Sequence, residues 1–223
     1  MDVKLFSRAM LKFAAGVLLM GLLLFLPAGT FHWRRAWLLM AVLFVPMFGA
    51  GLVMLFKSPE LLRKRLSAKE EQPEQRRVVA ASGAMFVTAF LLAGLGRRFG
   101  WPTLPGIVSW VATGIFLLGY VLYAEVLREN VWLSRTVEVQ ANQQVVDTGL
   151  YGIVRHPMYL STLLLFLAMP LILGSIPAFI VTLAYIPIIR CRIISEEAVL
   201  MAGLAGYAEY MKKVRYRLIP CIW

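Results

Sequence analysis

Six long apolar segments constrain this chain more than any other feature of its sequence. They cover residues 13–26, 36–56, 78–95, 104–127, 158–173 and 176–189. A helix needs about 20 apolar residues to span a bilayer. The first four segments reach that length, the first of them if its helix begins near Leu5. The last two are shorter and are separated only by Gly174 and Ser175, which predicts a tight helical hairpin that need not cross the full bilayer.

The composition agrees with a membrane protein. Of the 223 residues, 60% are hydrophobic, whereas soluble domains are closer to half apolar. The period-two alternation of a membrane β-barrel is absent. We therefore expect an all-α integral membrane protein with about six transmembrane helices.

The positive charges are divided unequally between the two sides of this membrane arrangement. The net charge is +11, and 19 of the 23 Lys and Arg residues fall within residues 1–12, 57–77, 128–155 and 190–217. The opposite side carries only Arg34, Arg35, Arg97 and Arg98. The positive-inside rule places the richer side, with both termini, in the cytoplasm. It also explains the basic charge without a nucleic-acid partner. Every Asp and Glu lies on the same side, so we expect a cytoplasmic active site.

The cysteines and the first helix add two expectations. Cys191 and Cys221 both fall on the reducing side, so we expect no disulfide, and no Cys/His cluster indicates a metal. The first apolar segment lacks a small-residue cleavage site and is followed by Pro27. We therefore expect this helix to be retained rather than removed as a signal peptide.

Polar residues divide the chain into two parts. Residues 1–107 form transmembrane hairpins joined by a cytoplasmic basic linker, 57–77. In this linker Leu61, Leu62 and Leu66 have the spacing of an interfacial helix, although a solvated connection that obeys the charge rule is the simpler interpretation. Residues 108–223 carry nearly all the unusual polar groups. They include a polar connector in which residues 136–140 alternate like a short strand.

The sequence "RHPMY", residues 155–159, stands where the chain enters the fifth apolar segment. Pro157 suits the first position of a helix, which puts His156 at the cap and Tyr159 one turn beyond it. The free N–H groups and the dipole at such a terminus attract anions. The motif could therefore hold a carboxylate or phosphate. Equally, Arg155 and His156 could anchor the helix to lipid headgroups, with Tyr159 in an aromatic belt.

Two further clusters follow. In "RCRIISEEAVL", residues 190–200, Arg192 and Glu196 are four positions apart on a helix. Ionisable groups emerging from a membrane helix are functional candidates, although a salt bridge that ends the span is the alternative. Near the C-terminus, Tyr207, Tyr210 and Val214 have helical spacing beside four basic residues. They predict an amphipathic helix that lies on the membrane and closes over the cytoplasmic end, or a simple membrane anchor.

The order of these motifs resembles the isoprenylcysteine carboxyl methyltransferase family, which is related to the phospholipid N-methyltransferases. The resemblance rests on "VVDTGLYGIVRHPMYLS", "RCRIISEEAVL" and "GYAEYMKKVRYRLIPCIW" and covers roughly residues 130–223. Two features depart from the family pattern. Ser161 replaces the usual Gly, and the segment between Glu197 and Tyr207 is one residue shorter.

The resemblance implies a membrane enzyme that transfers a methyl group from S-adenosylmethionine within a cytoplasmic pocket of the C-terminal half, 108–223. It implies that Arg192 and Glu196 orient the acceptor. The cofactor contacts that it implies are Gln143, Gln144, Val145, Val146, Tyr151, His156, Pro157, Met158, Tyr159 and Glu197.

The acceptor implied by the resemblance is lipophilic and enters laterally from the bilayer, between the last spans. The carboxylate of an isoprenylcysteine-like substrate is the leading candidate, and Arg192 could hold it. A phospholipid amine is the alternative, with Glu196 as its base.

Two other classes stay open. An NADPH-dependent sterol-reductase-like enzyme also has a polar element before a span, but residues 158–162 read "MYLST" and lack the Asn and Asp typical of that class. A helical scaffold or lipid-binding protein would use both polar clusters as headgroup anchors.

Overall fold

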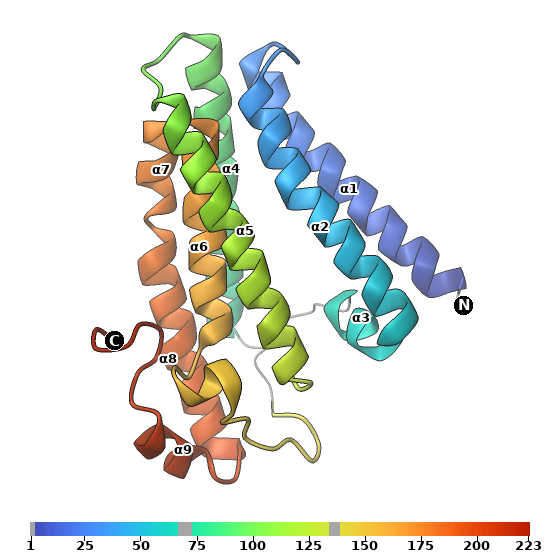
Figure 1. Ribbon diagram of the computed structural model, residues 1–223, viewed down its shortest axis with the longest axis vertical. Helices are drawn as coiled ribbons and strands as arrows, with labels where there is room; N and C mark the ends of the chain where they lie inside the picture. The colour runs from blue at the N-terminus through green and yellow to red at the C-terminus, as the bar shows by residue number, and fades with distance from the viewer. Residues whose placement is uncertain (1–2, 67–72, 134–138) are drawn as a thin grey trace.

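The structure, a computed structural model, describes residues 3–66, 73–133 and 139–223. These residues are helical apart from turns, loops and one isolated bridge between Thr103 and Ser175. In chain order the elements are α1 (Val3–Ala28), α2 (Arg34–Lys57), α3 (Pro59–Leu66), α4 (Pro73–Arg98), α5 (Gly106–Glu129), η1 (Gly149–Gly152), α6 (Pro157–Leu173), α7 (Ile176–Thr182), α8 (Tyr185–Gly203) and α9 (Tyr207–Lys213) (Figure 1).

Within the described ranges, five helices are long and apolar enough to span a membrane: α1, α2, α4, α5 and the continuous helical segment Ile176–Gly203. The shorter apolar helix α6 runs beside them over 17 residues. The prediction of an all-α membrane protein with about six transmembrane helices is therefore confirmed in architecture. The predicted strand at 136–140 lies largely outside the described residues.

The last spanning segment, Ile176–Gly203, differs from the expected short hairpin. It reaches Gly203 and has 28 residues, because α7 and α8 follow one another with only a break at Leu183 and Ala184. Pro187 has no N–H to bond the Leu183 carbonyl, which instead accepts from the Ile186 N–H at 3.1 Å. The proline therefore interrupts the helical hydrogen bonding of this segment without reversing the direction of the chain.

The helices form a bundle against which the pair α1 and α2 leans (Figure 1). The pair lies close to α4 and α6 at one end and diverges from the bundle toward the end where α3 lies. The core at the close end includes Leu24, Leu39, Phe116 and Ile172, none of which is exposed. Farther along, the Tyr120 hydroxyl of α5 donates to the Leu43 carbonyl of α2 at 2.6 Å. This contact holds the diverging pair to the bundle.

The basic linker begins with a helix that packs on the protein. In α3, Leu62 is buried against Leu5 of α1 and Leu55 of α2. The Lys12 ammonium of α1 donates to the Leu66 carbonyl at 2.6 Å. The helical spacing of the linker leucines thus serves an internal contact, and neither the interfacial nor the solvated interpretation foresaw it.

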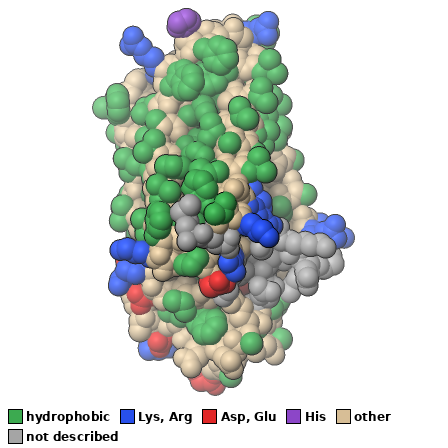
Figure 2. All heavy atoms as spheres, turned by 90° about the vertical axis from the view of Figure 1, so that its right-hand side faces the viewer, with side chains coloured by type: hydrophobic (Ala, Val, Ile, Leu, Met, Phe, Trp, Pro, Cys, Tyr) green, Lys and Arg blue, Asp and Glu red, His purple; other side chains and the backbone are tan. Residues whose placement is uncertain are grey.

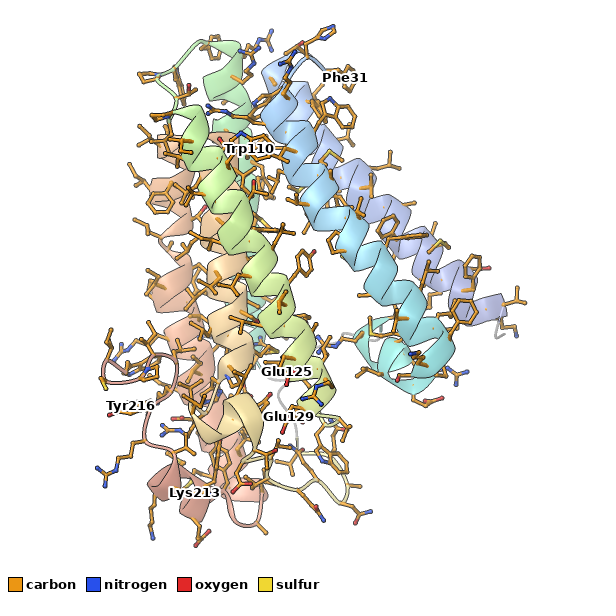
Figure 3. The ribbon with its side chains drawn as sticks, viewed as in Figure 1. Phe31, Trp110, Glu125, Glu129, Lys213 and Tyr216 are labelled. Atoms are coloured by element: carbon orange, nitrogen blue, oxygen red, sulfur yellow. The ribbon has the colours of Figure 1, made fainter. Side chains whose placement is uncertain are left out.

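Charged and apolar side chains separate along the long axis of the molecule. Figure 2 shows a face whose middle is covered by hydrophobic side chains, with acidic groups confined to its lower part and a histidine at the opposite end. Figure 3 places Glu125, Glu129 and Lys213 at the lower end and Phe31 at the other. This separation is what a bilayer around the middle of the bundle requires.

Helices α5 and α6 approach each other closely at Gly119. A Cβ at this position would lie 2.9 Å from Leu165 Cγ and 3.2 Å from the Ser161 carbonyl oxygen. Ser161 is itself fully buried. Small residues on both helices are therefore needed for this contact, as is common between membrane helices. The departure from the family pattern at Ser161 keeps the position small.

We expect Gly119→Ala to lower the melting temperature of the detergent-purified protein, because its methyl group overpacks this contact at a cost of about 1–3 kcal/mol. Gly114→Ala on the same helix is the control, since nothing lies within 4 Å of its added Cβ. Thermal unfolding followed by tryptophan fluorescence measures both. Equal melting temperatures for the two variants would show that the helices are not in tight contact here.

Candidate active site

A pocket of about 90 Å³ lies where α5 and α8 end and α6 begins, beneath α9 and the described part of the connector, residues 139–148. Its walls come from segments distant in the sequence. The lining residues are Asn130, Trp132, Leu133, Gln143, Gln144, Val145, Val146, Tyr151, Arg155, His156, Met158, Tyr159, Glu196, Leu200, Leu204, Tyr207 and Tyr210.

The "RHPMY" motif forms the floor of this pocket and is fixed by backbone contacts. Pro157 occupies the first turn of α6, as predicted, and His156 is the N-cap. The N–H groups of Arg155 and His156 donate to the carbonyls of Tyr216 and Arg217, each at 2.9 Å. The chain after α9, residues 214–223, therefore acts as a C-terminal strap that holds the motif in place.

Beside the floor, one carboxylate gathers three partners. Glu197 Oε1 accepts from Arg155 Nε at 2.8 Å and lies 3.2 Å from His156 Nε2. Its other oxygen, Oε2, accepts from Arg217 Nε at 2.8 Å. Glu197 is 4% exposed, and Arg155 is buried as well. Arg155 completes its bonds through Nη1, which donates to the carbonyls of Val214 and Arg215 at 2.8 Å each.

We call Glu197, Arg155, His156 and Arg217 the Glu197 cluster. In it, the anion that the basic side chains bind is a carboxylate of the protein itself. A buried charge is tolerated only where it is paired and hydrogen-bonded, and both guanidinium groups meet that condition here. The sequence predicted that Arg155 and His156 could hold an external carboxylate or phosphate. In the structure they hold Glu197, which does not line the pocket. Its expected contact with a cofactor stays a prediction.

Glu196, the neighbouring acid, faces the pocket and belongs to a second polar group. The Tyr159 hydroxyl donates a short hydrogen bond to Glu196 Oε2 and accepts from Arg192 Nε at 2.9 Å. Arg192 does not line the pocket, whereas Tyr159 and Glu196 do. The predicted pairing of Arg192 with Glu196 is thus made through Tyr159, which lies 4% exposed between them.

Three further tyrosines form an aromatic wall. The Tyr210 hydroxyl donates to the Tyr151 carbonyl at 2.8 Å, and Asn130 Nδ2 donates to the Tyr151 hydroxyl at 3.0 Å. Burial raises the pKa of the Tyr151 phenol, although the Asn130 hydrogen bond opposes the shift. Burial, followed by the Glu197 and Glu196 charges, raises the pKa of Tyr207. Both phenols therefore stay neutral at physiological pH.

The Tyr207 hydroxyl stands apart from the others. It is buried, and no other described residue bonds it. A buried hydroxyl without a partner costs about 1–3 kcal/mol. Because Tyr207 lines the pocket, this hydroxyl is available to a polar atom of a bound molecule.

The connector closes the pocket from above. Gln143, Gln144, Val145 and Val146 all line it, and their contact with a cofactor stays a prediction. The Gln143 N–H donates to the Gln140 carbonyl at 3.1 Å, which forms a turn. Val145 packs with Leu204 and Tyr207, among others. An ion pair of 2.6 Å between Lys213 Nζ and Asp147 Oδ2 ties the connector to α9.

Some site residues differ from the sequence-based prediction. Pro157 lies against a separate hollow with Leu122 and Leu150. The C-terminal helix α9 is only 7 residues long, and its tyrosines face the protein rather than the membrane. The spacing of Tyr207 and Tyr210 was the signal for this apolar face, but it did not reveal what the face covers. The pocket residues absent from the expected cofactor and acceptor contacts are Asn130, Trp132, Leu133, Arg155, Leu200, Leu204, Tyr207 and Tyr210.

A helical membrane protein with a buried polar site at one end of its bundle is the class that this geometry defines. Residues 107–205 match the model of the phospholipid methyltransferase family. This segment carries most of the candidate active site and somewhat under half of the chain. The match agrees with the resemblance to membrane methyltransferases that the motifs carry.

Two known proteins are also similar to this chain. The delta(14)-sterol reductase TM7SF2 of Mus musculus is 31% identical over 91 residues, which are 40% of this chain and 22% of the reductase. The chain therefore spans about a fifth of the length of that relative. The structure of the eukaryotic intramembrane Ras methyltransferase ICMT (isoprenylcysteine carboxyl methyltransferase), without a monobody, has a TM-score of 0.49 and 17% identity. That similarity covers 100% of this chain and 87% of the other, and it is too weak to define a shared function.

We expect Glu197→Gln to destabilise the protein by about 3–5 kcal/mol, because it leaves the buried Arg155 charge without its partner. Detergent-phase unfolding in urea measures the loss. Glu209→Gln on α9 is the control, since Glu209 is exposed. If both variants unfold at the same urea concentration, the Glu197 cluster does not hold the C-terminal strap.

Proposed function

We propose that this protein transfers a methyl group from S-adenosylmethionine to a lipidic acceptor at the cytoplasmic face of a membrane. One observation carries the proposal. A single pocket joins the connector, the "RHPMY" motif and the aromatic wall beside Glu196. The family match over residues 107–205 supports the same class of reaction.

The pocket residues suit the cofactor chemically. A sulfonium cation is stabilised by aromatic faces by about 0.5–2 kcal/mol, and Tyr151 and Tyr159 offer such faces. The unpaired Tyr207 hydroxyl would bond a polar atom of the cofactor, and the Gln143 and Gln144 amides offer further donors and acceptors. The fit therefore rests on an orphaned buried hydroxyl as well as on residue type.

The size of the pocket adds a condition. Small-molecule sites usually occupy about 300–1,000 Å³, and this pocket has about 90 Å³. The connector is the part of the pocket wall that can move outward, because the ion pair that ties it to α9, between Lys213 and Asp147, is exposed. We infer that cofactor binding displaces the connector, a movement common in enzymes that enclose their substrates.

S-adenosylmethionine supplies an activated methyl group for direct displacement, so the protein has mainly to position donor and acceptor. Correct positioning can contribute about 7–11 kcal/mol. The group formed by Arg192, Tyr159 and Glu196 is placed for this task. A carboxylate acceptor is already ionised, and Arg192 would hold it. An amine acceptor must lose a proton, and Glu196 would accept it.

We retain both acceptor chemistries. The motif resemblance favours the carboxylate of an isoprenylcysteine-like substrate. The phospholipid methyltransferase match and the position of Glu196 at the pocket favour a phospholipid amine as the second candidate. In either case an apolar tail would stay in the bilayer while the head reached the pocket from the membrane. The positive-inside rule supports a cytoplasmic position for this end of the bundle and for both termini.

We expect the detergent-purified protein to bind S-adenosylhomocysteine and Tyr207→Phe to weaken that binding about 3- to 10-fold, the effect of losing one neutral hydrogen bond. The unliganded variant should fold at least as stably, because it loses an unpaired buried hydroxyl. Isothermal titration calorimetry measures both affinities.

NADPH is the control ligand for this titration. Binding of NADPH without S-adenosylhomocysteine would assign the protein to the reductases, and binding of neither would favour a non-catalytic lipid-binding role. Unchanged affinity in Tyr207→Phe would place the cofactor elsewhere.

We expect Glu196→Gln to separate the two acceptors. If the acceptor is an amine, loss of the base should lower the rate about 100-fold or more. If it is a carboxylate, the rate should change far less, because that acceptor needs no base. Methyl transfer from labelled S-adenosylmethionine to phosphatidylethanolamine and to N-acetyl-farnesylcysteine, both in vesicles, makes the comparison. Turnover of neither lipid by the wild-type protein would count against the proposed reaction.

A further inference from the structure

A second and larger cavity lies at the opposite end of the bundle, far from the candidate active site. Its volume is about 340 Å³, and it lies between the start of α2, the end of α4 and the turn from α6 to α7. Helix α6 extends from one site to the other, and its 17 residues span about 25 Å. The two sites therefore cannot share one small ligand.

The charges around this cavity are of one sign. Arg34, Arg35 and Arg97 line it, and the described residues that line it include no Asp or Glu. No Asp or Glu occurs in residues 3–59, 75–124 or 148–195, the stretches of the sequence that contain the whole lining of the cavity. Among the described residues these guanidinium groups thus have no carboxylate partner, which favours an anionic ligand.

Arg35 is held in a fixed position with part of its donor capacity unused. Its Nη2 donates to the Leu104 carbonyl at 2.9 Å. Its Nη1 is buried and has no hydrogen-bond partner among the described residues. A buried cationic N–H without a partner is costly. An anion in the cavity would supply the missing acceptor.

The backbone around Arg35 is shaped to admit its guanidinium. Gly174 ends α6 with a φ of 72°, and a Cβ there would lie 1.7 Å from Arg35 Nη1. A residue with a Cβ at this position would displace the Arg35 guanidinium, and its backbone would be strained at this positive φ. Arg97 Nη2 donates to the His32 carbonyl at 3.3 Å, which positions a second guanidinium at the rim. A guanidinium group recognises phosphate oxygens well, since it can donate two parallel hydrogen bonds to them.

The surroundings of the cavity indicate the nature of the ligand. Trp33 and Trp101 line it, and indole rings favour the membrane interface. Large apolar side chains are exposed nearby, including Phe31 in the loop before α2 and Trp110 in the first turns of α5 (Figure 3). A molecule with a phosphate head and an apolar tail would satisfy both the arginines and this surface.

We propose that this arginine cavity binds the phosphate group of a phospholipid headgroup in the leaflet opposite the candidate active site. Arg35 and Arg97 bond the phosphate oxygens, and the tails lie along the exposed apolar surface. The site is independent of the proposed methyl transfer, since it shares no residue with the pocket. A soluble phosphate ester has the same recognised group and is the other possible source.

The test uses the full-length protein in an uncharged detergent. Dioleoyl phosphatidylglycerol and glycerol phosphate are titrated separately, and the apparent Kd is taken from the rise of the melting temperature. We expect Arg97→Gln to weaken lipid binding about tenfold, as for loss of one charge-assisted hydrogen bond. Arg98→Gln removes the same charge from a residue outside the cavity, and we expect it to bind within about twofold of wild type.

Arg35→Gln should weaken binding further, and Arg97→Gln keeps the test decisive if that variant fails to fold. Lipid binding without glycerol phosphate binding supports a headgroup site, whereas comparable binding of both would make a soluble phosphate ester the ligand and overturn the lipid assignment. Binding of neither, or identical affinities for Arg97→Gln and Arg98→Gln, would overturn the site. No methyl transfer enters the measurement, so its outcome is separate from that of the proposed function.

Discussion

The buried carboxylate of Glu197 is the interaction on which the candidate active site depends. It joins Arg155 before α6, its own helix α8, and Arg217 in the C-terminal strap. Three segments that are far apart in the sequence therefore meet at one charge. Each of these charges would be costly to bury alone, and together they compensate one another. The strap adds backbone bonds to Arg155 and His156. The floor of the pocket is rigid for this reason.

Adjacent acids on one helix consequently have different roles. Successive side chains on a helix point about 100° apart, so Glu197 turns into the protein while Glu196 turns toward the pocket. The charge of Glu197 is compensated by Arg155 and Arg217. The Glu196 carboxylate instead accepts a hydrogen bond from the Tyr159 hydroxyl. This division leaves Glu197 in the buried cluster and Glu196 at the pocket, where we propose that it meets the acceptor.

The membrane imposes the larger arrangement. Polar groups gather at the two ends of the bundle, and the middle presents apolar side chains (Figure 2). Helix α6 is shorter than the other long helices, so its two ends bring polar sites within about 25 Å of each other. The pocket at one end is lined by Glu196 and several tyrosines, whereas the described lining of the cavity at the other end includes arginines and indole rings but no acid. The same bundle thus presents chemically different sites to the two leaflets.

The sequence by itself determined the elements and much of the site's composition. The length of the apolar segments specified the membrane helices, because a chain that crosses a bilayer must bond its backbone internally. Pro157 specified where α6 begins. The motifs also identified Tyr159, Glu196 and the connector. Only the tertiary structure decided the partner of each polar group. It assigned Glu197 to Arg155 and turned Tyr207 inward, because such pairings depend on distances between segments far apart in the chain, and local spacing does not encode those distances.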